Sequence, residues 1–104
     1  MSHEENPLAI FQREAPEVQQ AFDGLIQSLI KTDGLDAKTK QLIYIAMKAA
    51  NGDSIAIRFH VPMAKKCGAT REEIRDTILL TLTVCGLKGI TTCLKTALDA
   101  YDAE

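Results

Sequence analysis

The chain contains no tryptophan, only 5% aromatic residues and no block of basic residues. Its 12 lysines and arginines are scattered along 104 residues, and the net charge is −2. Binding to nucleic acid generally needs a basic patch, and a membrane-spanning helix needs about 18 or more consecutive apolar residues. Neither pattern is present, so the composition predicts that neither nucleic acid nor membrane is a partner.

Other absences concern location and metal binding. The first residues, Met-Ser-His-Glu-Glu, lack the basic and apolar regions of a signal peptide, so we expect a cytoplasmic protein. The three cysteines, Cys67, Cys85 and Cys93, include no Cys-x-x-Cys pair and are odd in number, which argues against a disulfide framework. Each lies on an apolar side of an expected helix, and we expect small, buried, reduced thiols. No His, Cys, Asp or Glu cluster has the spacing of a metal site.

The residues that are present indicate helices throughout and a single domain over residues 1–104. Pro7 and Pro16 stand at positions that open helices, where their missing N–H costs nothing. Asp36 is placed to cap a helix over 37–50, which Asn51-Gly52 ends. Further helices are expected over 54–67, 71–85 and 89–102. Pro62 lies inside the first of these, so we expect a kink or an early break there.

One histidine occupies an unusual position in this pattern. Ala56, Phe59, His60, Met63 and Cys67 recur at helical spacing and therefore share one side of the 54–67 helix. A titratable ring among apolar neighbours needs either a partner or a chemical role. From the residues alone, His60 is either a core histidine that bonds to a backbone carbonyl or to Gln41, or an acid–base group in a pocket between helices.

The helices are more apolar than a small monomer requires. The 37–50 helix carries two apolar stripes side by side, and the second half of 71–85 has almost no polar residue. A helix that is apolar around most of its circumference must be covered on most sides. The pattern therefore predicts self-association.

The middle of the chain resembles the carboxymuconolactone decarboxylase family, which includes the AhpD-like alkylhydroperoxide reductases. The resemblance covers about residues 35–86. The segments that carry it are Leu-Asp-Ala-Lys-Thr-Lys-Gln-Leu-Ile-Tyr-Ile-Ala at 35–46, Ala-Ala-Asn-Gly at 49–52, His60-Val61, Ala64, and Gly-Ala-Thr-Arg-Glu-Glu-Ile at 68–74. It implies an all-α, AhpD-like domain of about six helices that forms a homo-oligomer, often a trimer or a hexamer.

The redox branch of that family uses a Glu and then Cys-x-x-Cys-x-x-x-His. Counting back from His60, the two cysteine positions are Asp53 and Ala56, and the Glu position is Gln41. A dithiol cycle needs a thiolate and groups that move protons, and only His60 remains of the four. The resemblance therefore makes thiol-dependent peroxide or disulfide reduction the least favoured function.

The decarboxylase branch also has the histidine without paired cysteines. It implies a small organic acid or lactone as ligand, no cofactor, and His60 as a group that could protonate carbon after loss of carbon dioxide. Arg58, Lys40 and Lys48 are candidates to bind a carboxylate. We expect His60 as the candidate catalytic residue, supported by Gln41 as the partner that selects its tautomer. The alternative is a non-catalytic oligomeric or partner-binding protein that retains the fold.

Overall fold

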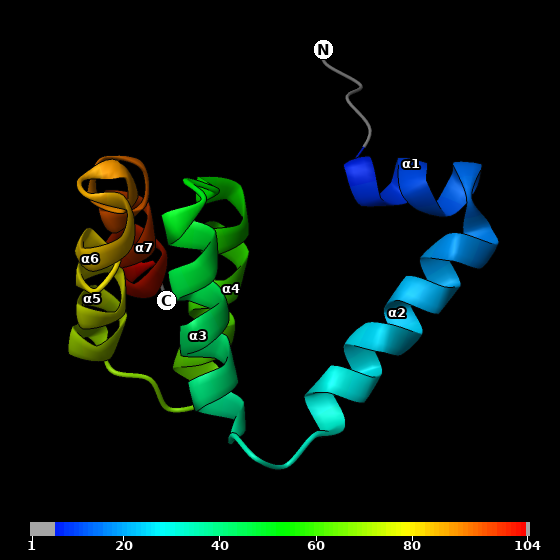
Figure 1. Ribbon diagram of the computed structural model, residues 1–104, viewed down its shortest axis with the longest axis horizontal. Helices are drawn as coiled ribbons and strands as arrows, with labels where there is room; N and C mark the ends of the chain where they lie inside the picture. Colours follow the sequence, from blue (N-terminus) through cyan, green and yellow to red (C-terminus); the bar gives the residue numbers. More distant parts are fainter. Residues whose placement is uncertain (1–5, 104) are drawn as a thin grey trace. The chain divides into compact units, whose positions relative to one another are not determined.

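The computed structural model describes residues 6–103, and all regular structure in that range is helical (Figure 1), as the sequence predicts. The chain forms two compact units, residues 1–34 and 35–104, and each is described by itself. None of the helices described is long and apolar enough to cross a membrane. His3, the second histidine of the sequence, lies outside the described residues.

The first unit is a pair of helices, α1 (Pro7–Glu14) and α2 (Pro16–Lys31). Both begin with proline, and the Asn6 side chain caps α1 by accepting a hydrogen bond from the Leu8 N–H at 2.8 Å. The rings of Phe11 and Phe22 join the two helices, with centroids 6.3 Å apart. Neither helix contains a buried residue, so this unit has almost no core of its own.

The second unit contains α3 (Ala37–Ala50), α4 (Ser54–Lys66), α5 (Arg71–Leu79), the short α6 (Leu82–Cys85), the π-helix η1 (Ile90–Leu94) and α7 (Lys95–Asp102). Helices α3 and α4 lie side by side, and α7 packs against α4 and α5 (Figure 1). Their buried side chains form one core: Ile45, Ala49, Ile57, Val61, Ala64, Ala69, Ile74, Ile78, Cys93 and Ala97.

Side-chain caps fix where the helices of this unit begin. Asp36 accepts a hydrogen bond from the Thr39 N–H at 2.8 Å, and Asp53 accepts one from the Ala56 N–H at 3.1 Å. A capping box opens α5: the Thr70 hydroxyl accepts from the Glu73 N–H, and the Glu73 carboxylate accepts from the Thr70 N–H. These bonds satisfy N–H groups that have no partner inside their helix.

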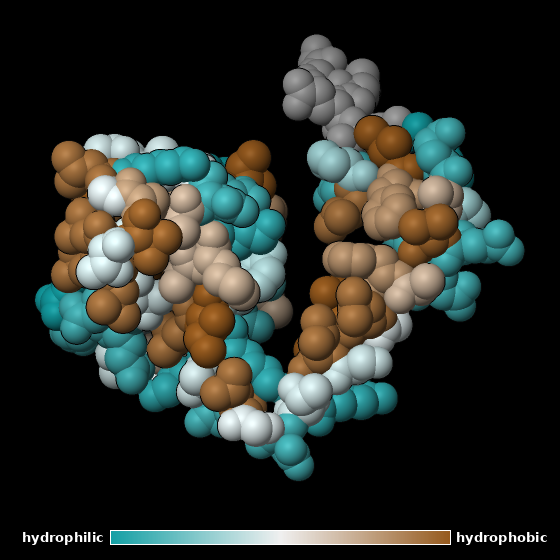
Figure 2. Space-filling model, in the orientation of Figure 1, coloured by the Kyte–Doolittle hydropathy of each residue, from teal (hydrophilic) through white to brown (hydrophobic). Residues whose placement is uncertain are grey.

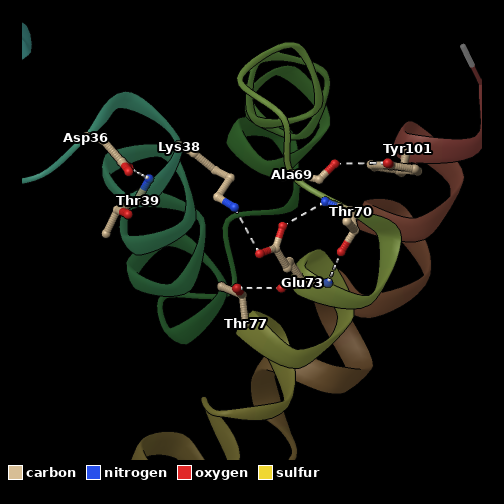
Figure 3. Close-up of polar contacts among 8 residues, drawn as sticks. All are labelled: Asp36, Lys38, Thr39, Ala69, Thr70, Glu73, Thr77 and Tyr101. Carbon is tan, nitrogen blue, oxygen red and sulfur yellow. Dashed lines mark hydrogen bonds and ion pairs between the residues drawn. The ribbon is translucent and has the colours of Figure 1, made fainter.

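The same capping region ties the helices together (Figure 3). The Lys38 ammonium of α3 lies 3.0 Å from the Glu73 carboxylate of α5, so one carboxylate both caps a helix and joins two. The Tyr101 hydroxyl of α7 donates to the Ala69 carbonyl at 2.9 Å, just before α5 begins. Both contacts lie at the start of α5 and hold α3 and α7 to it.

Two turns use glycine because the backbone there has a positive φ. Gly52, between α3 and α4, has φ +74°, and Gly68, after α4, has φ +99°. A side chain is strained in this conformation, which glycine adopts freely. The turn at Gly52 reverses the chain so that α4 packs along α3.

Three details differ from the sequence prediction. Helix α4 continues through Pro62 to Lys66, so the early break considered there is wrong. The expected 71–85 helix ends at Leu79, and the last expected helix begins as a π-helix at Ile90. At the break, backbone bonding tightens from i−4 to i−3, with the Thr81 N–H donating to the Ile78 carbonyl at 3.0 Å. The buried Thr81 hydroxyl donates to the same carbonyl, an alternative to regular helix bonding.

A close glycine contact lies at this break. Gly89 lies against Thr81 and the backbone carbonyl of Ala49, and a Cβ at position 89 would collide with the Thr81 hydroxyl. The backbone before η1 therefore packs directly on the end of α5 and on α3. Such an approach leaves no room for any larger residue.

Large apolar side chains remain exposed on both units (Figure 2). In the second unit they lie mainly on α3 and α4 and around α6, where Val84 is 78% exposed. The two apolar stripes expected on α3 have different environments: Ile45 and Ala49 are buried, but Ile43 and Met47 are exposed. The second stripe thus lacks the cover that the sequence pattern predicts for it.

Candidate functional site

His60 lies at the edge of the side of α4 that packs against α3. The core positions of α4 are Ile57, Val61 and Ala64, all completely buried, and His60 is half-buried next to them. The face that groups His60 with Phe59 and Met63 in the sequence is therefore not the core side, because both of these neighbours are exposed. His60 stands where the core meets the surface.

Gln41, on the second turn of α3, is the hydrogen-bond partner of His60. Its side-chain oxygen Oε1 lies 3.0 Å from His60 Nδ1. Because an amide oxygen can only accept, Nδ1 carries the proton and donates it in this contact. A neutral ring in that tautomer has an unprotonated Nε2, which can accept a proton or a hydrogen bond. The sequence analysis named Gln41 as a possible partner of His60. Its role in selecting the tautomer of the ring stays a prediction.

Two further residues of α3, Tyr44 and Lys48, complete the surroundings of the ring. The Tyr44 ring lies against His60, with centroids 4.0 Å apart and planes tilted by 32°. The Lys48 ammonium lies 5.6 Å from the centre of the Tyr44 ring and 3.4 Å from an Asp53 carboxylate oxygen. Residues 41, 44 and 48 follow one another at helical spacing, so one side of α3 faces this region.

Burial and charge act in the same direction on His60. Partial burial lowers the pKa of the imidazole below its ordinary value, and the positive charge of Lys48 lowers it further. The Ala56 backbone N–H is the main cause that lowers the pKa of Asp53, with a smaller contribution from Lys48. At neutral pH the His60 imidazole is therefore neutral and the Asp53 side chain is an ionised carboxylate.

The positions that would carry a redox pair hold other chemistry. Asp53 is the N-cap of α4, and Ala56 donates its N–H to that cap. The three cysteines lie elsewhere, and the expectation that all are buried is correct only for Cys93. Cys67 is exposed because it is the C-cap of α4, where the helix ends. Cys85 is half-buried, and its thiol contacts the Thr81 carbonyl at 3.4 Å.

Arg58 points away from this region, as its spacing from His60 implies. It lines a separate concavity of about 310 Å³ with Thr96, Asp99, Ala100 and Ala103 of α7 and its end. Among residues 6–103, no group of three or more His, Cys, Asp or Glu side chains could hold a metal ion. Of the three cations considered for a carboxylate, Lys48 is the one whose charge acts on His60.

Sequence reasoning identified His60 and Gln41 but gave no role to Tyr44. The sequence contains a pattern that could have indicated Tyr44. Gln41, Tyr44 and Lys48 recur at offsets 0, 3 and 7 and form the polar side of an otherwise apolar helix. What could not be read was that this side faces His60, because that depends on how α4 is rotated against α3. The contact between two helices decides it.

Comparisons with known proteins agree with this fold. The model of the carboxymuconolactone decarboxylase family matches residues 16–99. A crystal structure of the apo form of a carboxymuconolactone decarboxylase family protein from Legionella pneumophila is 34% identical, covers 92% of this chain and 85% of its own, and superposes with a TM-score of 0.81.

Two curated relatives extend the similarity without indicating an activity. An uncharacterized protein of Cupriavidus necator is 28% identical over 88 residues, which is 85% of this chain and 77% of its own length. An uncharacterized protein of Methanocaldococcus jannaschii is 28% identical over 89 residues, 85% of this chain and 86% of its own.

Proposed function

Because the chain belongs to the carboxymuconolactone decarboxylase family, we propose that it binds or transforms a small organic acid or lactone at a site built on His60. The chemistry is acid–base and needs neither a cofactor nor a thiol. The observation that carries the proposal is the hydrogen bond from His60 Nδ1 to Gln41, which leaves Nε2 of the half-buried ring as a proton acceptor.

The environment of His60 favours a base as its first role. Its pKa is lowered by burial and by Lys48, so the ring is neutral when a ligand arrives at neutral pH. Because a ligand carboxylate is ionised at neutral pH and has no proton to give, the ring takes one from water through Nε2. The role expected from the sequence then follows: when carbon dioxide leaves, His60 gives this proton to the carbon, and the net reaction consumes one proton from water.

Lys48 supplies the positive charge that an organic acid requires. Its ammonium group stands beside Tyr44, which lies against the His60 ring, and its present partner is the partly exposed Asp53 carboxylate. An exposed ion pair contributes little to stability, so a ligand carboxylate can compete for the lysine at little cost. Such a ligand would place its acidic group on Lys48 and its reacting atoms near Nε2, as a cofactor-independent lyase requires.

A second candidate has its own support. The exposed apolar side chains of α3 and α4 favour a homo-oligomer, for which the family resemblance implies a trimer or a hexamer, and a protein with that role could dispense with catalysis. Thiol-dependent peroxide reduction is ranked last, because Asp53 and Ala56 occupy the cysteine positions and Cys93 is buried.

The test is a titration with a panel of small carboxylates and lactones, read from the ring resonances of His60 and from turnover. We expect ligands to shift these resonances and His60→Ala to lower the turnover rate by about 10²-fold or more, with the particle mass unchanged. Lys48→Met should weaken binding of carboxylates but not of neutral lactones. Arg58→Met, in the separate concavity, is the matched control and should change neither.

Two results would contradict the proposal. One is turnover that persists in His60→Ala, which would remove the imidazole from the chemistry. The other is peroxidase activity that disappears when Cys67, Cys85 and Cys93 are changed to serine, which would place a thiol at the centre of the function. If no carboxylate or lactone shifts the His60 resonances or is turned over, and the protein is oligomeric, the non-catalytic candidate is favoured.

A further inference from the structure

The two tyrosines of the chain make different contacts. Tyr101 of α7 packs against the core, and its hydroxyl donates a hydrogen bond to the Ala69 carbonyl at 2.9 Å (Figure 3). Tyr44 of α3 is half-buried and is not one of the side chains that pack on that core. Within residues 6–103 its hydroxyl has no hydrogen-bond partner, so the contacts of Tyr44 are those of its ring.

The ring of Tyr44 lies on the imidazole of His60. The two centroids are 4.0 Å apart and the planes are tilted by 32°, so the rings are in contact over part of their faces. The last torsion of a histidine side chain has no sharp preferred value of its own. The neighbours of the ring therefore decide how it is turned, and Tyr44 limits that rotation.

The orientation of the imidazole determines what its nitrogens can do. Gln41 Oε1 accepts a hydrogen bond from Nδ1 at 3.0 Å only while that edge of the ring is turned toward α3. A half-turn would bring a ring carbon to Gln41 and move Nδ1 away. Either nitrogen of a neutral imidazole can carry the proton, and water competes for a hydrogen bond at a half-buried group. Gln41 can therefore select the tautomer only if something else keeps the ring from turning.

Tyr44 is placed to do this because it lies three residues after Gln41 on α3. Residues three apart in a helix lie on the same side, one turn from each other. Helix α3 thus presents two different contacts to the same ring: Gln41 meets its edge and Tyr44 meets its face. A contact at the edge and a contact on the face together fix a planar group, which neither contact does alone.

We propose that Tyr44 is a positioning residue, whose ring holds the imidazole of His60 in the orientation that directs Nδ1 to Gln41 and leaves Nε2 free for proton transfer. The hydroxyl of Tyr44 has no part in this role. The orientation of the ring is a property of the free protein. Its consequence for a ligand rests on the function proposed above, in which Nε2 transfers the proton.

The first measurement is nuclear magnetic resonance of the free protein at about pH 7.5, where the ring is neutral. The His60 signals are those that His60→Ala lacks. Nitrogen shifts should show the proton on Nδ1 in wild type, and Overhauser effects should connect the ring protons of Tyr44 and His60. Tyr44→Leu should give a mixture of tautomers, because the face contact is lost, and Tyr44→Phe should restore the wild-type form. Lys48 and its partner Asp53, the charges beside the site, are unchanged in both variants.

The other tyrosine provides the matched control. Tyr101→Leu removes a ring and a hydrogen bond from the core, so it should lower the temperature of unfolding but leave the tautomer of His60 unchanged. Tyr101→Phe should also lower that temperature, because its hydroxyl is bonded, whereas Tyr44→Phe should not. Tyr44→Met, which retains length without a ring, should give the same mixture of tautomers as Tyr44→Leu and replaces it if the leucine variant does not fold.

The kinetic consequence is a loss of rate without a loss of binding. With any carboxylate or lactone that wild type turns over, Tyr44→Leu should lower kcat by about 10-fold or more and leave KM nearly unchanged, because the chemical step alone needs the oriented ring. Tyr44→Phe should recover the rate. A rate in Tyr44→Phe as low as in Tyr44→Leu would assign the effect to the hydroxyl and overturn the proposal.

Three results of the ligand-free measurements would also overturn it: no Overhauser effect between the two rings, the wild-type tautomer retained in both Tyr44→Leu and Tyr44→Met, or an equal change of tautomer in Tyr101→Leu. If no ligand is turned over but the tautomers follow the expected pattern, the proposed function fails and the role of Tyr44 stands. If turnover depends on His60 but Tyr44→Leu keeps both tautomer and rate, the role of Tyr44 fails and the function stands.

Discussion

The two units of this chain have similar amphipathic helices but differ in what those helices bury. In residues 35–104, ten apolar side chains are buried and form one core. In α1 and α2 no residue is buried, although α2 is the longest helix described. A stripe of apolar residues thus predicts that a helix needs a partner surface, and it does not say whether the partner lies in the same chain.

The difference also bears on function. The second unit holds its helices with caps and cross-links such as Thr70–Glu73 and Lys38–Glu73, and it positions His60 and Gln41 on neighbouring helices without help from α2. The first unit brings no residue to that hydrogen bond.

The largest effect that separates the two units is expected from a pair of truncations. Ile57→Ala, at a fully buried core position, should lower the free energy of unfolding by about 2–5 kcal/mol because it leaves a cavity. Leu25→Ala, at an exposed position of α2, should change it by about 0.5 kcal/mol or less in dilute, monomeric protein. Urea unfolding monitored by circular dichroism measures both. Equal losses would mean that α2 is already packed in the single chain.

A smaller effect is expected from the caps that stabilise the second unit. Thr70→Ala removes the hydroxyl that accepts the Glu73 N–H, and it should cost about 1 kcal/mol in the same urea assay. Thr70→Ser retains a capping hydroxyl and should restore most of the loss. A neutral result for Thr70→Ala would show that water replaces the cap, and that packing alone determines where α5 begins.

The smallest effect is a pH dependence that belongs to the second unit alone. The lowered pKa of His60 means that the unfolded chain, with an ordinary value of 6.5, binds the proton more readily than the folded chain. The stability contributed by the neutral ring is therefore full above the unfolded pKa and falls as the pH drops below it. Urea unfolding at about pH 7.5 and about pH 5.5 should show this loss in wild type and a smaller one in His60→Gln. The same pH sensitivity in both proteins would assign it to other groups.

Local sequence signals predicted the helix boundaries well where caps and glycines act within a few residues. Asp36 caps α3 as expected, Asp53 and Thr70 cap α4 and α5 in the same way, and Gly52 makes the turn between α3 and α4. Pro62 misled the prediction because a helix already held by Ile57 and Val61 in the core tolerates one missing hydrogen bond. The π-helix and the break before α6 lie beside the close contact of Gly89 with Thr81, which the local sequence pattern did not predict.

In the candidate site too, some features follow from the sequence and others only from the packing of the helices. Counting from His60 located the missing thiols at Asp53 and Ala56, since spacing along one helix is a property of the sequence. Neighbours on another helix could not be counted: the contact of Tyr44 with His60 and the charge of Lys48 near the ring arise only when α3 and α4 pack. Likewise, the apolar side that contains Cys67 proved to be surface because α4 is rotated to bury Ile57 and Val61 instead.

The sequence by itself determined that the chain is helical, where most helices start, and that no Cys-x-x-Cys pair precedes His60, because caps, helical periodicity and residue identity act locally along the backbone. Only the tertiary structure decided which apolar stripes enter the core, which remain exposed, and that Gln41 meets the imidazole. Those outcomes depend on the rotation of one helix against another, which is set by the packing of the whole core.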